Sequence, residues 1–164
     1  GILTKDDAIS LGVAGSVLRA SGIPLDIRKA EPYDVYNEID FKVQYMKSGD
    51  SFARSMVPFL DMRESCHIIR QLLDKIPQAG EVRAKLQPNP KGPPGESYKR
   101  VESGRGALGY YIISDGTPRP YRVKISVGSF RNMLALPFLL VGSKLADMPS
   151  IYWSLNYWPV EADR

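Results

Sequence analysis

The clearest hydrophobic pattern along the chain predicts one long helix over residues 50–76. Its apolar residues recur at steps of three or four, at Phe52, Met56, Phe59, Met62, Cys66, Ile69, Leu73 and Ile76. Asp50 or Ser51 can cap the start of this helix, and Pro77 and Gly80 can end it. Pro58 lies inside the pattern and has no amide hydrogen to donate, so we expect a kink there.

A second apolar edge accompanies this stripe, at Leu60, Ile68 and Leu72. A helix with two apolar edges is typical of a position among several packed neighbours. The pattern therefore predicts that the long helix is buried within a helix bundle.

Alternating apolar and polar residues predict strands in two places. The first, Ile39 to Tyr45, ends a Gly- and Pro-rich segment that covers residues 1–45. The second is a pair of runs, 107–113 and 121–127, with Asp115-Gly116 in their connection. That arrangement indicates an antiparallel β-hairpin over residues 107–127.

The remaining elements are helices and a loop. A short helix is expected from Asp6 or Asp7 toward Arg19, weakened by two glycines, and a Pro-rich loop covers residues 87–96. Two apolar helices are expected in residues 130–164, over 130–145 with an interruption at Pro137 and over 149–157, before a short polar tail. The predicted fold class is thus α+β, mainly helical, with one hairpin.

Composition limits the possible chemistry. The 164 residues carry a net charge of +4, spread along the chain rather than concentrated as in a nucleic-acid binder. One Cys and one His cannot by themselves build a structural zinc site, a disulfide or a four-cysteine iron–sulfur site. The charge-free stretches of the chain, 132–143 among them, are all shorter than the roughly 20 residues of a membrane span.

Two further signals favour structural roles. Gly104, Gly106 and Gly109 form a G-x-G-x-x-G pattern, but a strand rather than a helix follows it, so we interpret it as a close backbone approach ahead of the hairpin. His67 and Cys66 are neighbours on the long helix, so their side chains diverge by about 100° and form no catalytic dyad.

Two groups of residues could contact a ligand. Glu102 and Arg105 flank glycines ahead of a buried strand, where they could enter one cavity or form a structural ion pair. The aromatic run from Ile151 to Trp158 could belong to the core or wall a pocket for a flat apolar ligand. The residues alone leave both alternatives open.

Several ordered motifs resemble one known family. They are Gly12-Val-Ala-Gly-Ser-Val-Leu-Arg-Ala-Ser-Gly22, Asp26-Ile-Arg-Lys-Ala30 with Pro32-Tyr33, Gly49-Asp50, Met62-Arg-Glu-Ser65, Val101-Glu-Ser-Gly-Arg-Gly-Ala-Leu-Gly109, Tyr121-Arg-Val-Lys-Ile125, Ser129-Phe130, Leu145-Ala-Asp147 and Val160-Glu-Ala-Asp-Arg164. This series is similar to the hydrogenase-derived D subunit of complex I-type enzymes, both NADH-quinone oxidoreductase and its archaeal deazaflavin-dependent counterpart. The resemblance covers nearly all of the chain and corresponds to the C-terminal part of that subunit, so residues 1–164 are expected to be that portion of a hydrogenase large-subunit-like helix bundle.

The resemblance also implies a metal site that has been lost. Nickel–iron hydrogenase large subunits end in a D-P-C-x-x-C motif, which falls here on residues 156–161, with Trp158 and Glu161 at the cysteine positions. A nickel–iron centre needs thiolate ligands, which neither residue supplies. In this family the vacated site has become part of the quinone-reduction cavity, so we expect no metal in this chain.

The function implied by the resemblance is acceptor reduction within a membrane-bound respiratory dehydrogenase. Electrons would pass from a [4Fe-4S] cluster on a small partner subunit to a quinone or phenazine-type carrier, coupled to ion translocation by the whole complex. The family's principal Tyr and His at the headgroup lie in the N-terminal half of the subunit, so we expect no catalytic residue here. Asn156, Trp158 and Glu161 are expected to wall the acceptor cavity, with Glu102 and Arg105 on its outer layer or proton path.

The resemblance further implies the location of the protein in the cell and its partner subunits. We expect a peripheral subunit on the cytoplasmic side of the cell membrane, in contact with the iron–sulfur subunit and other subunits of the complex, and with no nucleic acid. The family usually has Asp at the position of Asn156 and a smaller apolar residue at that of Trp158, departures that would suit a phenazine. The electron donor, NADH or reduced deazaflavin, stays open. Two alternatives are the large subunit of an energy-converting hydrogenase and a non-catalytic docking subunit.

Overall fold

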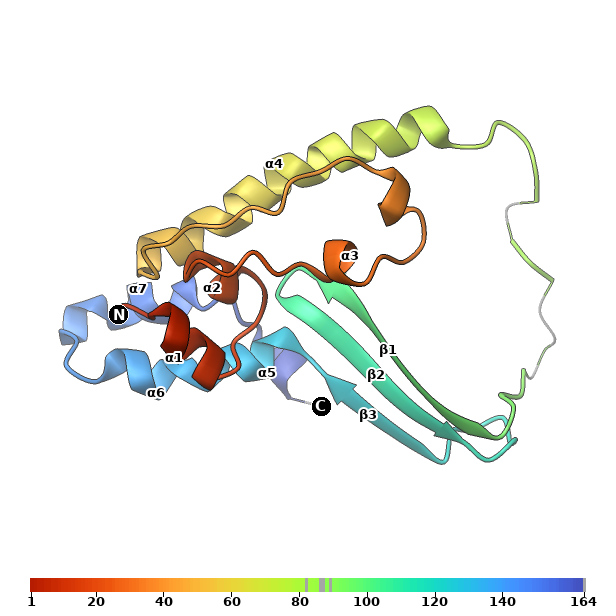
Figure 1. The fold of residues 1–164 in the computed structure, drawn as a ribbon. Helices are drawn as coiled ribbons and strands as arrows, with labels where there is room; N and C mark the ends of the chain where they lie inside the picture. Colours follow the sequence, from red (N-terminus) through yellow and green to blue (C-terminus); the bar gives the residue numbers. More distant parts are fainter. Residues whose placement is uncertain (82, 86–87, 89, 164) are drawn as a thin grey trace.

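The computed structural model describes residues 1–81, 83–85, 88 and 90–163. Helices gather around the two ends of the chain, one long helix crosses them, and a three-stranded sheet extends away from them (Figure 1). The α+β fold class predicted from the sequence is confirmed.

The main core lies among the short helices of the two ends. These are α1 (Lys5–Ser10), α2 (Gly15–Ala20), α5 (Gly128–Met133), α6 (Ala135–Leu140), the 3-10 turn η2 (Leu145–Asp147), α7 (Met148–Ser154) and α8 (Pro159–Ala162). Residues from both ends form one apolar cluster: Leu3, Ala8, Val13, Val17, Leu18, Ala135, Leu139, Ile151 and Leu155. The C-terminal helices are thereby fixed against α2.

The predicted long helix exists as α4 (Ser51–Lys75), capped by the Asp50 side chain, which accepts a hydrogen bond from the Ala53 amide. It continues through Pro58. Its packing differs from the prediction, because its buried residues are Ala53, Arg54, Val57 and Ile68. The apolar stripe instead faces outward, with Phe52, Phe59, Met62, Ile69, Leu73 and Ile76 all exposed. Helical spacing finds an apolar face but does not say whether this chain itself covers it.

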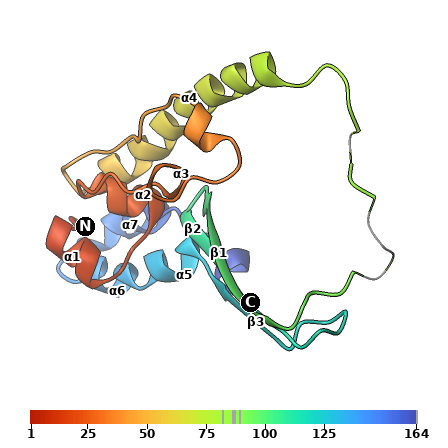
Figure 2. The same cartoon turned by 45° about the vertical axis from the view of Figure 1, so that its right-hand side comes forward.

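The predicted strand at 39–45 is extended but pairs with no strand of the described chain. It follows α3 (Ile27–Ala30) and the 3-10 turn η1 (Tyr36–Glu38) and runs along α4 (Figures 1 and 2). Side chains of α4 satisfy its backbone: Gln71 accepts from the Asp40 amide and donates to its carbonyl, and Glu64 accepts from the Lys42 amide. The predicted alternation holds at Ile39 and Phe41, which are buried against Ile68, but not at Tyr45, which is exposed. The extended segment 39–45 therefore packs on a helix, α4, rather than in a sheet.

The sheet has three antiparallel strands in the order β1 (Gly95–Ser103), β2 (Gly106–Ser114) and β3 (Arg122–Ser126). The hairpin predicted at 107–127 is confirmed as β2 and β3. β1 was not predicted, because the mostly polar edge sequence of residues 95–103 shows no apolar alternation. It begins inside the predicted Pro-rich loop, of which residues 87 and 89 lie outside the described residues.

Two helix boundaries also differ from prediction. The N-terminal helix is two helices, α1 and α2, because the chain turns between them at Gly12 and Gly15, which have φ angles of +64° and +59°. In the C-terminal region the break falls at Leu134 and not at Pro137, which sits in the first turn of α6 where a missing amide hydrogen costs nothing. None of the helices in the described part of the chain is long and apolar enough to cross a bilayer.

Candidate functional site

The tight turn between β1 and β2 is the centre of the site. It enters the helical body between α2 and α5, and its backbone touches the start of both helices. A Cβ on Gly106 would lie 2.5 Å from the Gly15 nitrogen, and a Cβ on Gly15 would lie 2.6 Å from the Arg105 carbonyl oxygen. The close approach expected from the G-x-G-x-x-G pattern is therefore present, and it fixes the turn that carries Glu102 and Arg105.

On one side of this turn, Arg105 meets the C-terminal tail. Its guanidinium carbon lies 5.6 Å from the centre of the Trp158 ring, within the range of a cation–π contact. Its Nε lies 3.7 Å from a Glu161 carboxylate oxygen. Ser129, at the start of α5, donates to the Glu161 carboxylate and accepts a hydrogen bond from the Trp158 amide. Three residues predicted to belong to the site thus lie together.

Asn156 anchors the tail to the same turn. Its side-chain nitrogen donates to the Ser16 hydroxyl at 3.0 Å and to the Gly104 carbonyl at 3.3 Å. Its φ of +47° lies in the left-handed region, which Asn tolerates better than most residues. The Asn at this position therefore turns the chain out of α7 and positions Trp158 beside Arg105.

Glu102, on the other side of the turn, belongs to a different group of side chains. One of its oxygens accepts from the Ile27 amide at 3.0 Å, and the other lies 3.4 Å from an Arg19 nitrogen. The ion pair of Glu102 is thus with Arg19, whereas that of Arg105 is with Glu161. The alternative of a Glu102–Arg105 ion pair at the strand entrance is not what this structure shows.

Arg19 is the centre of this second group, which we call the Arg19 cluster: Arg19, Asp26, Arg28, Asp61 and Glu102. Arg19 is 3% exposed and pairs with Asp61, Glu102 and Asp26. Arg28 pairs with Asp26 through two side-chain contacts, at 3.0 and 2.7 Å, and its amide donates to the same carboxylate at 2.9 Å. Four different elements, α2, α3, α4 and β1, thus contribute charged groups to one place.

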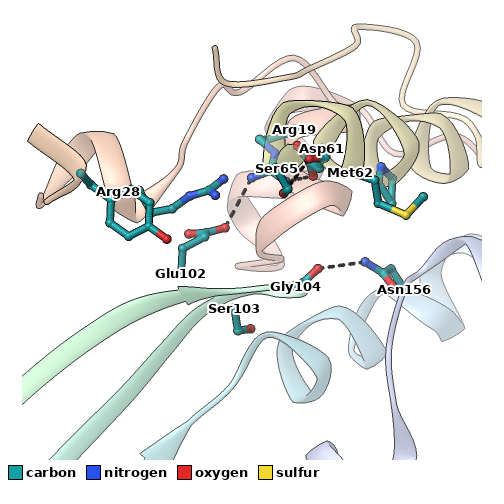
Figure 3. Close-up of a pocket in the computed structure, with 11 residues that line it drawn as sticks. Arg19, Arg28, Asp61, Met62, Ser65, Glu102, Ser103, Gly104 and Asn156 are labelled. Atoms are coloured by element: carbon teal, nitrogen blue, oxygen red, sulfur yellow. Dashed lines mark hydrogen bonds and ion pairs between the residues drawn. The ribbon is translucent and has the colours of Figure 1, made fainter. Parts of the chain in front are cut away.

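The Arg19 cluster opens into a cavity of about 320 Å³ that Asn156 also lines (Figure 3). One end of the cavity is lined by Glu102 and Arg28, and its α4 side by Asp61, Met62 and Ser65. Below these residues in Figure 3 lie Gly104 and Asn156. The cavity therefore brings the predicted residues Glu102 and Asn156 to the same space, although they do not touch.

Burial and pairing shift the carboxyl pKa values in opposite directions. Burial raises the pKa of Glu102 despite the Ile27 amide, and burial raises the pKa of Asp61 despite Arg19. Asp26 is also buried, but the hydrogen bonds and charge of Arg28 outweigh this, and its pKa is lowered. Two of the three carboxyls are therefore shifted toward the protonated form.

Sequence reasoning missed Arg19, Asp26, Arg28 and Asp61. All four lie within or beside the family motifs, but charged residues in a sequence pattern are normally assigned to the surface. The one available signal was Arg19 itself, which follows Val17 and Leu18 in a short apolar helix. Arg164, named in the last of the motifs, lies outside the described residues.

No group of three or more His, Cys, Asp or Glu side chains that could hold a metal ion occurs among the described residues. His67 and Cys66 are both exposed on α4, away from the turn.

Comparison with known proteins identifies the family. The sequence model of one protein family, the 49 kDa subunit of the respiratory-chain NADH dehydrogenase, matches residues 1–90 and 85–164. The chain belongs to this family. It is 48% identical to the D subunit of F(420)H(2) dehydrogenase from Methanosarcina mazei and 42% identical to the D subunit of NADH-quinone oxidoreductase from Dehalococcoides mccartyi, in both cases over its whole length.

The fold agrees with that assignment. A solved structure of the membrane-bound sulfane sulfur reductase, an archaeal respiratory membrane complex, contains a chain that is 40% identical to this one, with a TM-score of 0.91 over all of it. The present chain covers 45% and 44% of the two curated relatives and 46% of the solved chain. It thus spans less than half of the proteins that it matches.

Proposed function

We propose that this chain forms part of the acceptor-reducing module of a membrane-bound respiratory dehydrogenase. Electrons come from a [4Fe-4S] cluster on a small partner subunit, and a quinone or phenazine-type carrier accepts two electrons and two protons. The whole complex couples this reaction to ion translocation. The chain lies at the cytoplasmic face of the membrane as a peripheral subunit.

The observation that carries this proposal is the grouping of Arg105, Trp158 and Glu161 beside Asn156. Trp158 offers a flat apolar face and is 53% exposed, so it is free to contact a planar ring. Arg105 lies over the Trp158 ring and pairs with Glu161, so a cation and a carboxylate stand beside this aromatic group, suited to the oxygens or nitrogens of a carrier. This supports the roles we expect for Asn156, Trp158 and Glu161 as cavity wall and for Arg105 on its outer layer.

The position of the chain in an assembly is supported by its surface. α4 exposes most of its apolar stripe, which is typical of faces that other protein covers. The relatives from Methanosarcina mazei and Dehalococcoides mccartyi are themselves subunits of oxidoreductases.

The acceptor is tested by changing Trp158 in the intact complex. We expect Trp158→Ala to raise the KM for a quinone or phenazine acceptor roughly five- to tenfold, because a lost aromatic contact is worth about 1 to 1.5 kcal/mol. Trp153→Ala is the matched control, since Trp153 is 73% exposed on α7. The acceptors compared include a sulfane sulfur compound, because the solved relative belongs to a sulfane sulfur reductase. Unchanged KM and turnover for every acceptor would contradict the proposal.

Metal analysis of the full-length subunit, purified with its small partner, distinguishes acceptor reduction from hydrogenase activity. We expect iron and labile sulfide equivalent to one [4Fe-4S] cluster per pair and no nickel, because Trp158 and Glu161 stand where a nickel site needs thiolates. Stoichiometric nickel would favour an energy-converting hydrogenase. Binding of the partner without turnover by the complex would favour a docking subunit.

A further inference from the structure

The Arg19 cluster contains one more carboxyl group than it has cations. The groups that face one another are Arg19 from α2, Asp26 and Arg28 at the start of α3, Asp61 from α4 and Glu102 from β1, with the side chains of Tyr33 and Tyr36 beside them. If all three carboxyls were ionised, the cluster would carry a net charge of −1 in a largely buried place. A buried surplus charge is costly, so a carboxyl in such a place takes up a proton instead.

Contacts within the cluster decide which carboxyls share that proton. Asp26 accepts three hydrogen bonds from Arg28, which matches one cation with one carboxylate. Arg19 is then the single cation between Asp61 and Glu102, and it contacts both of them. The side chains of Asp61 and Glu102 are 24% and 7% exposed, so water compensates neither fully.

A second, independent feature indicates that the cavity beside this pair holds hydrogen-bonding molecules. The Arg19 side chain is only 4% exposed, and its buried Nε–H donor has no hydrogen-bond partner within the described protein. Buried donors are almost always satisfied, by protein or by ordered water. The adjoining 320 Å³ cavity is large enough for several waters, which would connect the pair with Asn156.

We propose that Asp61 and Glu102 hold one proton between them at neutral pH and release it, through the cavity that they share with Asn156, to the reduced acceptor. This inference rests on the proposed function. The acceptor takes two electrons from the iron–sulfur donor, an O–H bond of the carboxyl pair breaks, and a bond to an acceptor oxygen or nitrogen forms. The pair is reprotonated from solvent at Asp61, its more exposed member, and the second proton of the reaction comes from bulk water.

The raised pKa values of Asp61 and Glu102 agree with this assignment, since burial shifts both toward the protonated form. Neither residue touches the acceptor in this scheme. Both therefore hold the proton and reach the acceptor only through the cavity that they line.

The test measures acceptor reduction by the intact complex across a range of pH. Glu102→Gln leaves Arg19 with only Asp61, so the proton is lost from the pair and kcat at and above neutral pH should fall about tenfold or more, with little change in KM. Asp61→Asn should act in the same way, and both amides keep an oxygen that accepts hydrogen bonds. Glu102→Asp should restore much of kcat. Glu31→Gln is the matched control, because Glu31 pairs with Arg100 on the surface outside the cavity.

Infrared difference spectra of the same complex give a readout that a structural role would not move. The wild type should show the carbonyl stretch of a protonated carboxyl that changes on acceptor reduction, and each of the two amide variants should abolish or shift it. An unaltered band, or an unaltered pH profile of kcat in both variants, would overturn the proposal. If Trp158→Ala leaves KM and turnover unchanged and the metal analysis finds nickel, the proposed function is wrong. A carbonyl band that is present in the wild type and lost in both amide variants would still support the shared proton.

Discussion

Glu102 and Arg105 are three residues apart, yet the two sides of their turn differ in almost every physical respect. The Glu102 side is enclosed, and five charged groups from four elements fix one another there. The Arg105 side is open, with the Arg105–Glu161 ion pair at 3.7 Å and a Trp158 ring that is half exposed. The comparison shows how one turn can serve both as a rigid charged anchor and as an adaptable contact surface.

The turn itself is the feature on which both sides depend. Gly106 has a φ of +107° and no room for a Cβ beside Gly15, whereas a Cβ on Gly104 would meet nothing within 4 Å. Gly106→Ala should therefore displace both sides and destabilise the subunit by about 3 kcal/mol or more. Gly104→Ala, two residues away, is the matched control and should change stability by less than about 1 kcal/mol.

Thermal unfolding of the full-length subunit in its complex measures this difference. Equal unfolding temperatures for the two variants would show that the close approach to α2 does not fix the turn.

The enclosed side should be sensitive to acid in a defined way. Arg28 holds the pKa of Asp26 below its usual range, so this carboxylate stabilises the fold above about pH 4 and ceases to do so as the pH falls. Asp26→Asn should cost about 2 kcal/mol at neutral pH, because the charged hydrogen bonds from Arg28 are weakened. The stabilities of wild type and variant should converge as the pH falls below about 4.

Hydrogen exchange of the segment 23–33 in the full-length subunit is the local measurement for this effect. Glu38→Gln, at an exposed ion pair with Lys75, provides the control. A difference between wild type and Asp26→Asn that is the same at every pH would contradict the lowered pKa.

The open side should show the smallest effect on stability and a clear one on the acceptor. Arg105→Met keeps most of the length of the side chain and removes its charge, and partly exposed ion pairs contribute at most about 1 kcal/mol. We expect nearly unchanged unfolding and a KM for the acceptor raised several-fold. A loss of stability similar to that of Asp26→Asn would show that the two sides do not differ as described.

How much of the fold could be predicted from the sequence depends on whether the signal was local. The helix over 50–76 and the hairpin over 107–127 follow from periodicity, and both exist. Periodicity could not show that the stripe of α4 faces outward, because helical spacing marks an apolar face without fixing what packs against it. Nor could it show that residues 39–45 pair with the side chains of Gln71 and Glu64, since those bonds join distant positions.

The site was likewise predicted only where a local sequence signal existed. The resemblance supplied Asn156, Trp158 and Glu161, and proximity to glycines supplied Glu102 and Arg105. The separation of Glu102 from Arg105 could not be predicted, because it depends on Arg19 and Asp61, which lie 83 and 41 residues from Glu102 along the chain. Long-range charge pairing leaves no periodic pattern.

The most direct test of the acceptor cavity is photolabelling of the intact complex with an azido-substituted quinone or phenazine, followed by mass spectrometry of the labelled peptides. We predict that label in this chain falls on Arg105 and on residues 156–162, that excess natural acceptor removes it, and that Trp153 is unlabelled. Competable label confined to the outer face of α4 or to the far end of the sheet, with none at Trp158, would contradict the assignment of this turn and tail to the acceptor cavity.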